Sequence, residues 1–451
     1  MAHTPPLLGR TSVPLLDGRL AERAIATIDE IAAALRQPPR AWAPPGSSES
    51  ERAVLDASLA GGRAGLAVFF ATRARTRPKG GDGQLASDFL ADAIRALAEV
   101  PMSSSLFSGF TGVAWATLYV MGESPRPAGP VEESRTDESG DERDDRCSAI
   151  DDALAEYLTR SPWNDHYDLV SGLAGLGLYA LERLPHATAR SCAERVVLRL
   201  DELARHTSEG ITWHTPRELL GTHERDRYEQ GYFNLGMAHG VAGLVVVLAR
   251  CVASGVEARR ARRLLEGAVA WLLAQRGPEP GRRMPFAIAP GIDRLPARTA
   301  WCYGDPGVAA ALLLAGSLTG EEAWIAEALV MAGEVADLPP DACGVEDAGL
   351  CHGAMGLAHL CHHFHRATGE PRFADAARRW FEYGLALRRP GIEVAGFPAS
   401  IPDETGKKGW APDPGLLGGA AGVGLALIAA TTDADWSWDV PLLLSAPAAT
   451  P

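Results

Sequence analysis

The amino-acid sequence predicts an all-α fold, an (α/α)7 toroid of seven helical hairpins with seven inner and seven outer helices. Three observations support this expectation: a repeated Gly-x-x-Gly motif, an apolar segment after each copy, and an amphipathic segment between copies. The first glycines of the copies lie between 47 and 68 residues apart, a spacing typical of repeat architectures. They are Gly62, Gly109, Gly172, Gly240, Gly304, Gly353 and Gly419.

Each motif opens a segment that is apolar on every side, such as GVAGLVVV from Gly240. We expect such a helix to be buried, and an amphipathic helix to cover it with its apolar face. A closed ring buries every apolar helix without the polar end repeats that an open solenoid needs, so we expect a single domain over residues 1–451. The amphipathic segments cover residues 19–37, 82–100, 147–160, 187–207, 256–276, 320–338 and 370–389.

Two segments stand outside the repeats. Residues 123–146 contain nine acidic residues, four arginines and almost no large apolar side chain, so we expect a disordered acidic insertion there. The tail after about residue 433 follows the last repeat and is expected to be peripheral.

Composition excludes several classes of function. The chain has 43 basic and 57 acidic residues and a net charge of −14, which argues against nucleic acid or anionic membrane as its main partner. No apolar run is long enough to span a membrane, and no basic segment followed by an apolar run marks a signal peptide. Seven cysteines, an odd number, fit a reducing compartment better than a disulfide framework, so we expect a cytoplasmic protein.

The residues just before each Gly-x-x-Gly motif should line the central mouth of the ring, and they differ between repeats. Repeats one, two and seven carry only small or apolar residues there. Repeats three to six carry polar or reactive side chains, so we expect the chemistry on one arc of the ring. These residues are Tyr167, Asp168, Asn234, His239, Arg298, Trp301, Cys302, Tyr303, Cys351 and His352.

Cys302, Cys351 and His352 form a candidate metal site, because the two cysteines occupy equivalent positions in adjacent repeats. Two thiolates and an imidazole favour Zn²⁺ over Mg²⁺ or Ca²⁺, and three protein ligands leave a fourth position open, as in catalytic zinc sites. The other cysteines are interpreted as structural. A second His-rich segment, with Cys361, His359, His362, His363 and His365, is expected to hold solvated or hydrogen-bonded histidines.

The motifs WCYGDPG (301–307), LCHGAMG (350–356) and NLGMAHG (234–240) resemble those of the LanC family of lanthipeptide cyclases, and the resemblance spans essentially the whole chain. It implies an (α/α)7 toroid and the addition of peptide cysteine thiols to dehydroalanine or dehydrobutyrine, which forms lanthionine and methyllanthionine rings. It also implies Zn²⁺ at the candidate site and four residues around the reaction centre: His239, Asp168, Arg298 and Tyr303.

The chemistry accounts for these residue types. A free thiol has a pKa of about 8.5, so little thiolate exists at neutral pH, whereas binding to Zn²⁺ deprotonates the thiol. Addition to the dehydro residue then builds an enolate that needs a hydrogen-bond donor and a proton, and His239 is the candidate acid. Asp168 is expected to orient His239 or keep it protonated, and Arg298 to position the peptide or stabilise the enolate. Tyr303 is the next candidate acid.

The resemblance implies a dehydrated precursor peptide as substrate and a separate dehydratase, since only a short segment precedes the first amphipathic helix. It also admits a peripheral association with a membrane-bound biosynthetic complex. Three alternatives remain: a zinc enzyme on another α/α toroid, such as a protein prenyltransferase subunit; a LanC-like enzyme that adds glutathione or another thiol; and a non-catalytic peptide-binding scaffold. Seven repeats and an adjacent Cys-His pair favour the cyclase over the prenyltransferase. Retention of the ligands and of His239 favours an enzyme over a scaffold, whereas nothing in the sequence separates the two thiol-adding activities.

Overall fold

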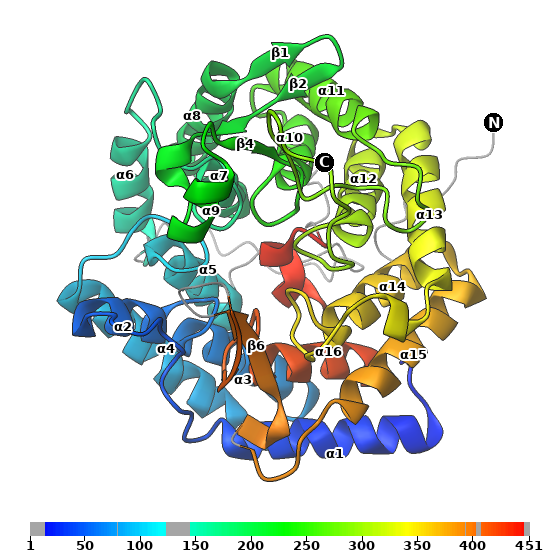
Figure 1. Ribbon diagram of the computed structural model, residues 1–451. Helices are drawn as coiled ribbons and strands as arrows, with labels where there is room; N and C mark the ends of the chain where they lie inside the picture. Colours follow the sequence, from blue (N-terminus) through cyan, green and yellow to red (C-terminus); the bar gives the residue numbers. More distant parts are fainter. Residues whose placement is uncertain (1–13, 79, 123–144, 393, 403–406, 446–451) are drawn as a thin grey trace, which may run out of the picture.

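The computed structural model shows a ring of helices, with the inner ones around the centre and the outer ones at the rim (Figure 1). It describes residues 14–78, 80–122, 145–392, 394–402 and 407–445. The predicted (α/α)7 toroid is confirmed by this arrangement.

Seven inner helices each begin directly after the first glycine of a Gly-x-x-Gly motif, which is the N-cap residue. They are almost fully buried, as expected for segments without a polar face. Within the described residues, no helix is both long enough and apolar enough to cross a membrane. The inner helices are α3 (Arg63–Thr76), α5 (Phe110–Met121), α7 (Leu173–Glu182), α10 (Val241–Ala253), α12 (Asp305–Thr319), α14 (Ala354–Thr368) and α16 (Ala420–Thr431).

The outer helices are amphipathic, and each packs on the inner helix that precedes it in the ring. In the fifth outer helix, α11, the side chains of Ala261, Leu264 and Leu265 are buried against the ring. The first outer helix pairs with the last inner helix, and the backbone N–H groups of Leu15 and Leu16 both donate to Ala430 O, so the two ends of the chain close the ring. The outer helices are α1 (Gly18–Ala34), α4 (Asp82–Glu99), α6 (Ser148–Tyr157), α8 (Ala187–Leu203), α11 (Ala258–Ala274), α13 (Glu322–Asp337) and α15 (Pro371–Ala386).

The second glycine of each motif lies against a backbone carbonyl, where no side chain fits. A Cβ added at Gly112 would stand 1.9 Å from Leu106 O and 3.1 Å from the Cβ of Leu59 in the preceding repeat. A Cβ added at any of the other six second glycines would stand 2.0 to 2.5 Å from the equivalent carbonyl oxygen of its own repeat. The second glycine is therefore required for each inner helix to pack closely on the turn of its own repeat, and at Gly112 it also leaves room for the preceding repeat.

A closed cycle of seven backbone hydrogen bonds joins these turns. Its members stand two residues before the first glycine of each repeat, and each donates its N–H to the carbonyl of the equivalent residue in the next repeat. The N···O distances run from 2.9 to 3.5 Å. In order the donors are Ala60, Phe107, Val170, Ala238, Cys302, Cys351 and Leu417, and Leu417 donates back to Ala60.

The residue after each member of this cycle directly precedes the first glycine, and in all seven repeats it is partly exposed. The residue before each member is apolar and buried in all seven. The cycle thus sets a common register in which one position faces the core and another faces the mouth. The mouth-facing residues are Gly61, Ser108, Ser171, His239, Tyr303, His352 and Gly418.

Short elements between the hairpins were not predicted from the sequence. One sheet has the order β3-β4-β5 and two others are antiparallel pairs, β1-β2 and β6-β7. A small separate apolar cluster forms around Tyr228 and Tyr232. The elements are α2 (Glu49–Ala57), α9 (Thr222–Arg227), β1 (Arg205–Thr207), β2 (Gly210–Thr212), β3 (His214–Thr215), β4 (Tyr232–Asn234), β5 (Ala287–Ile288), β6 (Pro398–Pro402), β7 (Lys408–Pro412), and the 3-10 helices η1 (Arg217–Leu219), η2 (Pro340–Ala342), η3 (Val394–Gly396) and η4 (Ser437–Leu442).

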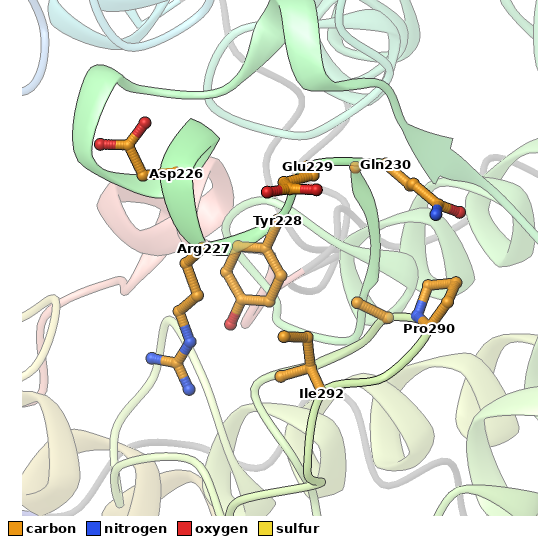
Figure 2. A pocket seen from close by; sticks show the side chains of 9 residues that line it. Asp226, Arg227, Tyr228, Glu229, Gln230, Pro290 and Ile292 are labelled. Atoms are coloured by element: carbon orange, nitrogen blue, oxygen red, sulfur yellow. The ribbon is translucent and has the colours of Figure 1, made fainter.

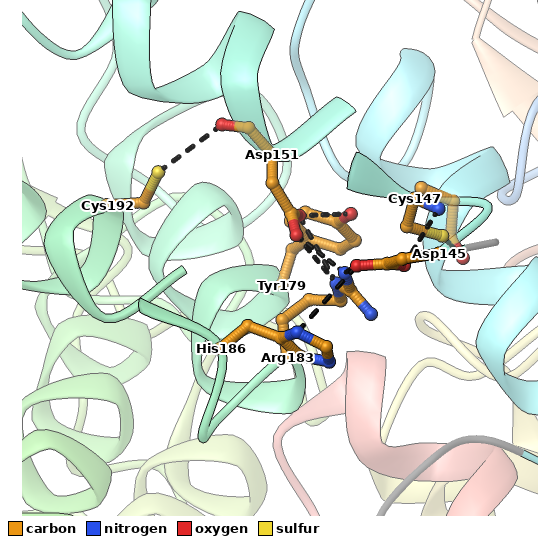
Figure 3. Close-up of polar contacts among 8 residues, drawn as sticks. Asp145, Cys147, Asp151, Tyr179, Arg183, His186 and Cys192 are labelled. Atoms are coloured by element: carbon orange, nitrogen blue, oxygen red, sulfur yellow. Dashed lines mark hydrogen bonds and ion pairs between the residues drawn. The ribbon is translucent and has the colours of Figure 1, made fainter. Parts of the chain in front are cut away.

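A buried ion pair joins α6 to α7 (Figure 3). Arg183 donates from Nη2 and Nε to Asp151 Oδ2 at 2.7 and 2.9 Å and also pairs with Asp145. Tyr179 donates to the other oxygen of Asp151 at 2.8 Å. This network holds α6 against α7. The predicted acidic insertion at 123–146 lies outside the described residues, except for its last two.

The tail after residue 433 is not peripheral, which corrects the expectation from the sequence. Trp436, Trp438, Val440 and Leu442 are at most 3% exposed, and η4 lies at the centre of the ring (Figure 1). Trp301 Nε1 donates to Leu442 O at 2.8 Å, which ties the tail to the fifth repeat. The short segment has no helical or strand periodicity, so its burial could not be read from its pattern.

Candidate metal centre and catalytic residues

Cys302, Cys351 and His352 converge at the mouth of the ring. Their ligand atoms all lie within 4.8 Å of one another. Cys302 and Cys351 are consecutive members of the hydrogen-bonded cycle, with Cys302 N donating to Cys351 O at 3.2 Å. The shared register of adjacent repeats therefore places two thiols side by side although 49 residues separate them along the chain.

The three groups form one coupled acid–base system. Hydrogen bonding with Cys351 lowers the pKa of Cys302 well below its usual range, against the effect of burial, and His352 lowers it further. The same hydrogen bond and burial raise the pKa of Cys351. Burial lowers the pKa of His352, but Cys302 and Asp347 outweigh it and raise the pKa overall. The lowered pKa of Cys302 favours negative charge on its sulfur, which suits a cation.

Asp347 stands behind His352 and was missed in the sequence analysis. Its Oδ2 lies 3.5 Å from His352 Nε2, and the carboxylate accepts the backbone N–H groups of Gly349 and Ser400 at 3.1 and 3.0 Å. The side chain is 2% exposed. Asp347 stands six residues before the first glycine of its repeat, where Asp56, Asn234 and Asp413 stand in theirs. That shared position is the signal that would have identified it.

His239 and Asp168 form a pair on the same arc. His239 Nδ1 donates to Asp168 Oδ2 at 2.8 Å, and Asp168 Oδ1 accepts Ser171 N–H at 2.7 Å. The Asp168 side chain is 7% exposed, whereas that of His239 is 40% exposed. Burial lowers the pKa of His239, but the charge and hydrogen bond of Asp168 outweigh it and raise the pKa. His166, also missed from the sequence, lies 3.9 Å from the same Asp168 oxygen.

The His239–Asp168 pair adjoins the three candidate ligands. Ala238 N donates to Cys302 O at 3.3 Å, so the turn that carries His239 is bonded to the turn that carries the first cysteine. The charge of Cys302 also contributes to the raised pKa of His239, after the effects of burial and Asp168.

Tyr303 and Arg298 differ in how firmly they are held. Tyr303 packs on Phe286 with ring centroids 4.4 Å apart, and its hydroxyl accepts from Asn234 Nδ2 at 3.2 Å. Burial raises its pKa well above the usual value, so the phenol stays protonated. Arg298 is exposed, and its charge is one of the influences that lower the pKa of Cys302, after hydrogen bonding with Cys351.

A separate pocket of about 220 Å³ lies beside α9 (Figure 2). It is lined by residues 226–231 on one side and by Ala289, Pro290 and Ile292 on the other. None of the candidate metal ligands or candidate catalytic residues lines it, so these candidates lie at the mouth and not in this pocket.

The sequence model of one protein family, the lanthionine synthetase C-like proteins, matches residues 53–129 and 135–443, which is most of the chain. The protein belongs to this family. The match includes every inner helix, all three candidate metal ligands and the four candidate catalytic residues.

Two relatives agree with membership of the lanthionine synthetase C-like family. Over 299 residues the chain is 23% identical to the nisin biosynthesis protein NisC of Lactococcus lactis subsp. lactis, a match that covers 60% of this chain and 65% of that protein. The solved structure of a nisin cyclase superposes with a TM-score of 0.69 at 18% identity, covering 95% of this chain and 98% of that one. The structural likeness shows the same fold over nearly the whole chain.

The residues at the mouth of this lanthionine synthetase C-like protein fit a zinc ion. Two sulfurs and one imidazole nitrogen converge from two adjacent turns, and three protein ligands leave one tetrahedral position open. The other cysteines are all buried and free. Burial raises the pKa of Cys251 and Cys361 to about 12, so these two stay protonated and unreactive.

Proposed function

We propose that this protein is a zinc-dependent lanthipeptide cyclase that acts on a dehydrated precursor peptide in the cytoplasm. The observation that carries the proposal is the adjacency of a Cys302–Cys351–His352 cluster and a His239–Asp168 pair on one arc of the mouth. The first group is suited to thiol activation and the second to proton transfer, and cyclisation needs both.

When bound, Zn²⁺ lowers the pKa of a coordinated thiol, so that a cysteine of the peptide is held as a thiolate at neutral pH. The sulfur attacks the β-carbon of a dehydroalanine or dehydrobutyrine and forms the thioether bond. The electron pair of the double bond moves onto the amide carbonyl as an enolate, which takes up a proton at its α-carbon. The proton released by the thiol balances the proton taken up.

In this proposal His239 supplies that proton. Its Nδ1 is bonded to Asp168, so the proton would come from Nε2 on the other side of the ring. Because Asp168 raises the pKa of His239, the imidazole keeps its second proton to a higher pH than a free histidine would. Asp168 thus orients the ring and maintains the acid, and the exposed Arg298 offers a cation for the enolate or the peptide.

Tyr303 has a supporting role in this proposal. Its hydroxyl proton stays in place, and the hydrogen bond from Asn234 and the packing on Phe286 fix the ring beside the turn that carries Cys302. The partners proposed are the precursor peptide and a separate dehydratase that prepares it, in a complex that associates peripherally with a membrane.

The test is a cyclisation assay on a dehydrated precursor peptide, with free thiols counted before and after and the product mass measured. Ring closure consumes peptide thiols without a change of mass, whereas addition of an external thiol raises the mass. His239→Ala should keep the fold and the metal while the rate falls by about 10²–10⁴-fold. Cys351→Ala should lose rate and one equivalent of Zn²⁺ together.

His206→Ala, a change at an exposed histidine in β1, is the matched control and should cyclise at the wild-type rate. If His239→Ala also cyclises at the wild-type rate, His239 is a packing residue and not the acid. If His239→Ala loses Zn²⁺, the division of roles between the two groups is wrong.

A further inference from the structure

Three other metal-binding side chains converge deeper in the ring. His359 and His363 lie one turn apart on α14, and Asp439 comes from η4, at least 76 residues further along the chain. His359 Nε2 and His363 Nε2 lie 2.8 and 2.7 Å from the same atom, Asp439 Oδ2. Both imidazoles thus point one nitrogen at a single carboxylate oxygen, and all three ligand atoms lie within 4.8 Å of one another.

The surroundings of this cluster are dry and aromatic. The His359 ring packs on Trp436 and Trp438 with centroid distances of 4.9 and 4.8 Å. The side chains of His359 and Asp439 are 1% and 0% exposed, and that of His363 is 16% exposed. The cluster therefore has one edge open to solvent, at His363.

The buried carboxylate of Asp439 is only half satisfied. Its Oδ1 is buried and has no hydrogen-bond partner among the described residues. Arg366, which lies over the Trp436 ring at 3.8 Å, contributes positive charge nearby.

We propose that His359, His363 and Asp439 bind a second Zn²⁺, separate from the candidate centre at the mouth. Two imidazoles and one carboxylate are a donor set that zinc accepts, and histidines spaced by four residues on a helix present their nitrogens on one face. The fourth position faces the open edge at His363. The three ligand atoms that already converge would bind the ion, and its charge would neutralise the buried carboxylate of Asp439.

This site is the weaker of the two. Binding through Nε2 requires a proton on Nδ1, and His359 Nδ1 is buried without a partner among the described residues. The mouth centre instead offers two thiolates, which bind zinc more strongly than a carboxylate. Chelation should therefore empty the His359–His363–Asp439 site first.

A second zinc ion would fix the position of the C-terminal tail relative to the mouth ligands. Asp439 belongs to the tail that fills the centre of the ring, and Leu442 in the same tail accepts the hydrogen bond of Trp301, the residue before Cys302. Helix α14 begins just after Cys351 and His352. Zinc at this site would therefore hold the tail in place next to the two turns that carry Cys302, Cys351 and His352.

The test measures Zn²⁺ per chain after equilibrium dialysis of the whole protein against buffered Zn²⁺ in the micromolar range. The wild type should hold two ions, and the Cys302→Ala/Cys351→Ala variant one. Asp439→Asn should hold one, because the amide oxygen still accepts a histidine N–H but has lost its charge; circular dichroism confirms the fold. His365→Ala, a change on the same helix outside the cluster, is the matched control and should hold two.

Cobalt substitution gives a second readout. Co²⁺ in the double cysteine variant should show d–d bands without the sulfur charge-transfer band that the wild type shows. One ion in the wild type and none in the double cysteine variant would overturn this inference and leave the mouth centre standing. Equal zinc content in Asp439→Asn and the wild type would overturn it as well. Two ions in the double cysteine variant would instead contradict the mouth ligands.

Discussion

The substitution Gly112→Ala tests whether the close packing of α5 on its own turn and on the preceding repeat stabilises the toroid. The added methyl group would stand 1.9 Å from Leu106 O and 3.1 Å from the Cβ of Leu59. The carbonyl oxygen and the main chain of α5 are both backbone, so neither can rotate away as a side chain could. The clash is relieved only if the turn and α5 move apart by about 1 Å. Overpacking of this kind costs about 1–3 kcal/mol or more, whereas alanine favours a helix over glycine by about 1 kcal/mol.

Gly83→Ala is the matched control. Gly83 is exposed in the first turn of α4, and its added Cβ would meet only the Cβ of Ala74, at 3.9 Å. This variant should be as stable as the wild type or slightly more stable. The measurement is the denaturant midpoint for loss of the helical circular dichroism signal, and Gly112→Ala should have the lower midpoint. Equal midpoints would refute the reasoning, because they would mean that α5 and its turn move apart at little cost.

A third variant separates the fold from the metal. A Cβ at Gly356 would stand 2.0 Å from Leu350 O, directly before Cys351, so Gly356→Ala should lose stability and zinc affinity together. Gly112→Ala lies on the opposite arc and should keep its zinc. If both variants lose zinc equally, the ring transmits distortion around its whole circumference.

Three further predictions concern carboxylates and use the isosteric change to asparagine. Asp347→Asn should weaken zinc binding at the mouth by about 10–100-fold in a competition titration with a chelator, because the residue that orients His352 loses its charge. Asp168→Asn should lower the pKa of His239, so the alkaline limb of the pH–rate profile should move to lower pH, whereas an unmoved limb would contradict the pairing. Burial raises the pKa of Asp413 from 3.8 to about 6. Its contribution to the free energy of unfolding is therefore fully present below pH 3.8 and is lost as the pH rises through 6. The loss is at most about 3 kcal/mol, since the side chain is partly exposed. Asp413→Asn should remove this part of the pH dependence, as measured by denaturation at pH 4 and pH 8.

The sequence predicted the ring because the physical requirement recurs in the chain. Every turn needs a glycine against the carbonyl of Leu106 or its equivalent, and every inner helix needs an apolar surface on all sides. A requirement repeated seven times produces a pattern that is visible without a structure. The same register placed Cys302 and Cys351 side by side, which is why a pair far apart in sequence was identified.

The missed features depend on side-chain contacts or on burial that the repeated motif does not itself reveal. Asp347 acts through its distance to His352, and His166 through its distance to Asp168. The burial of Trp438 depends on a tail without periodicity that enters the ring from its end. The strands span only two to five residues, too short for alternation to appear.

The hydrogen-bonded cycle explains how one arc can carry reactive side chains without disturbing the fold. Each turn is joined to the next through backbone N–H and C=O groups, so the side chains at these positions are not needed for closure. The same position is occupied by Ala60, Phe107 and Val170 on one arc and by Cys302 and Cys351 on the other, with N···O distances in the same range. A thiol can therefore replace an apolar side chain at little structural cost. The toroid supplies equivalent positions at fixed spacing, and the proposed chemistry depends on which of them carry sulfur and imidazole.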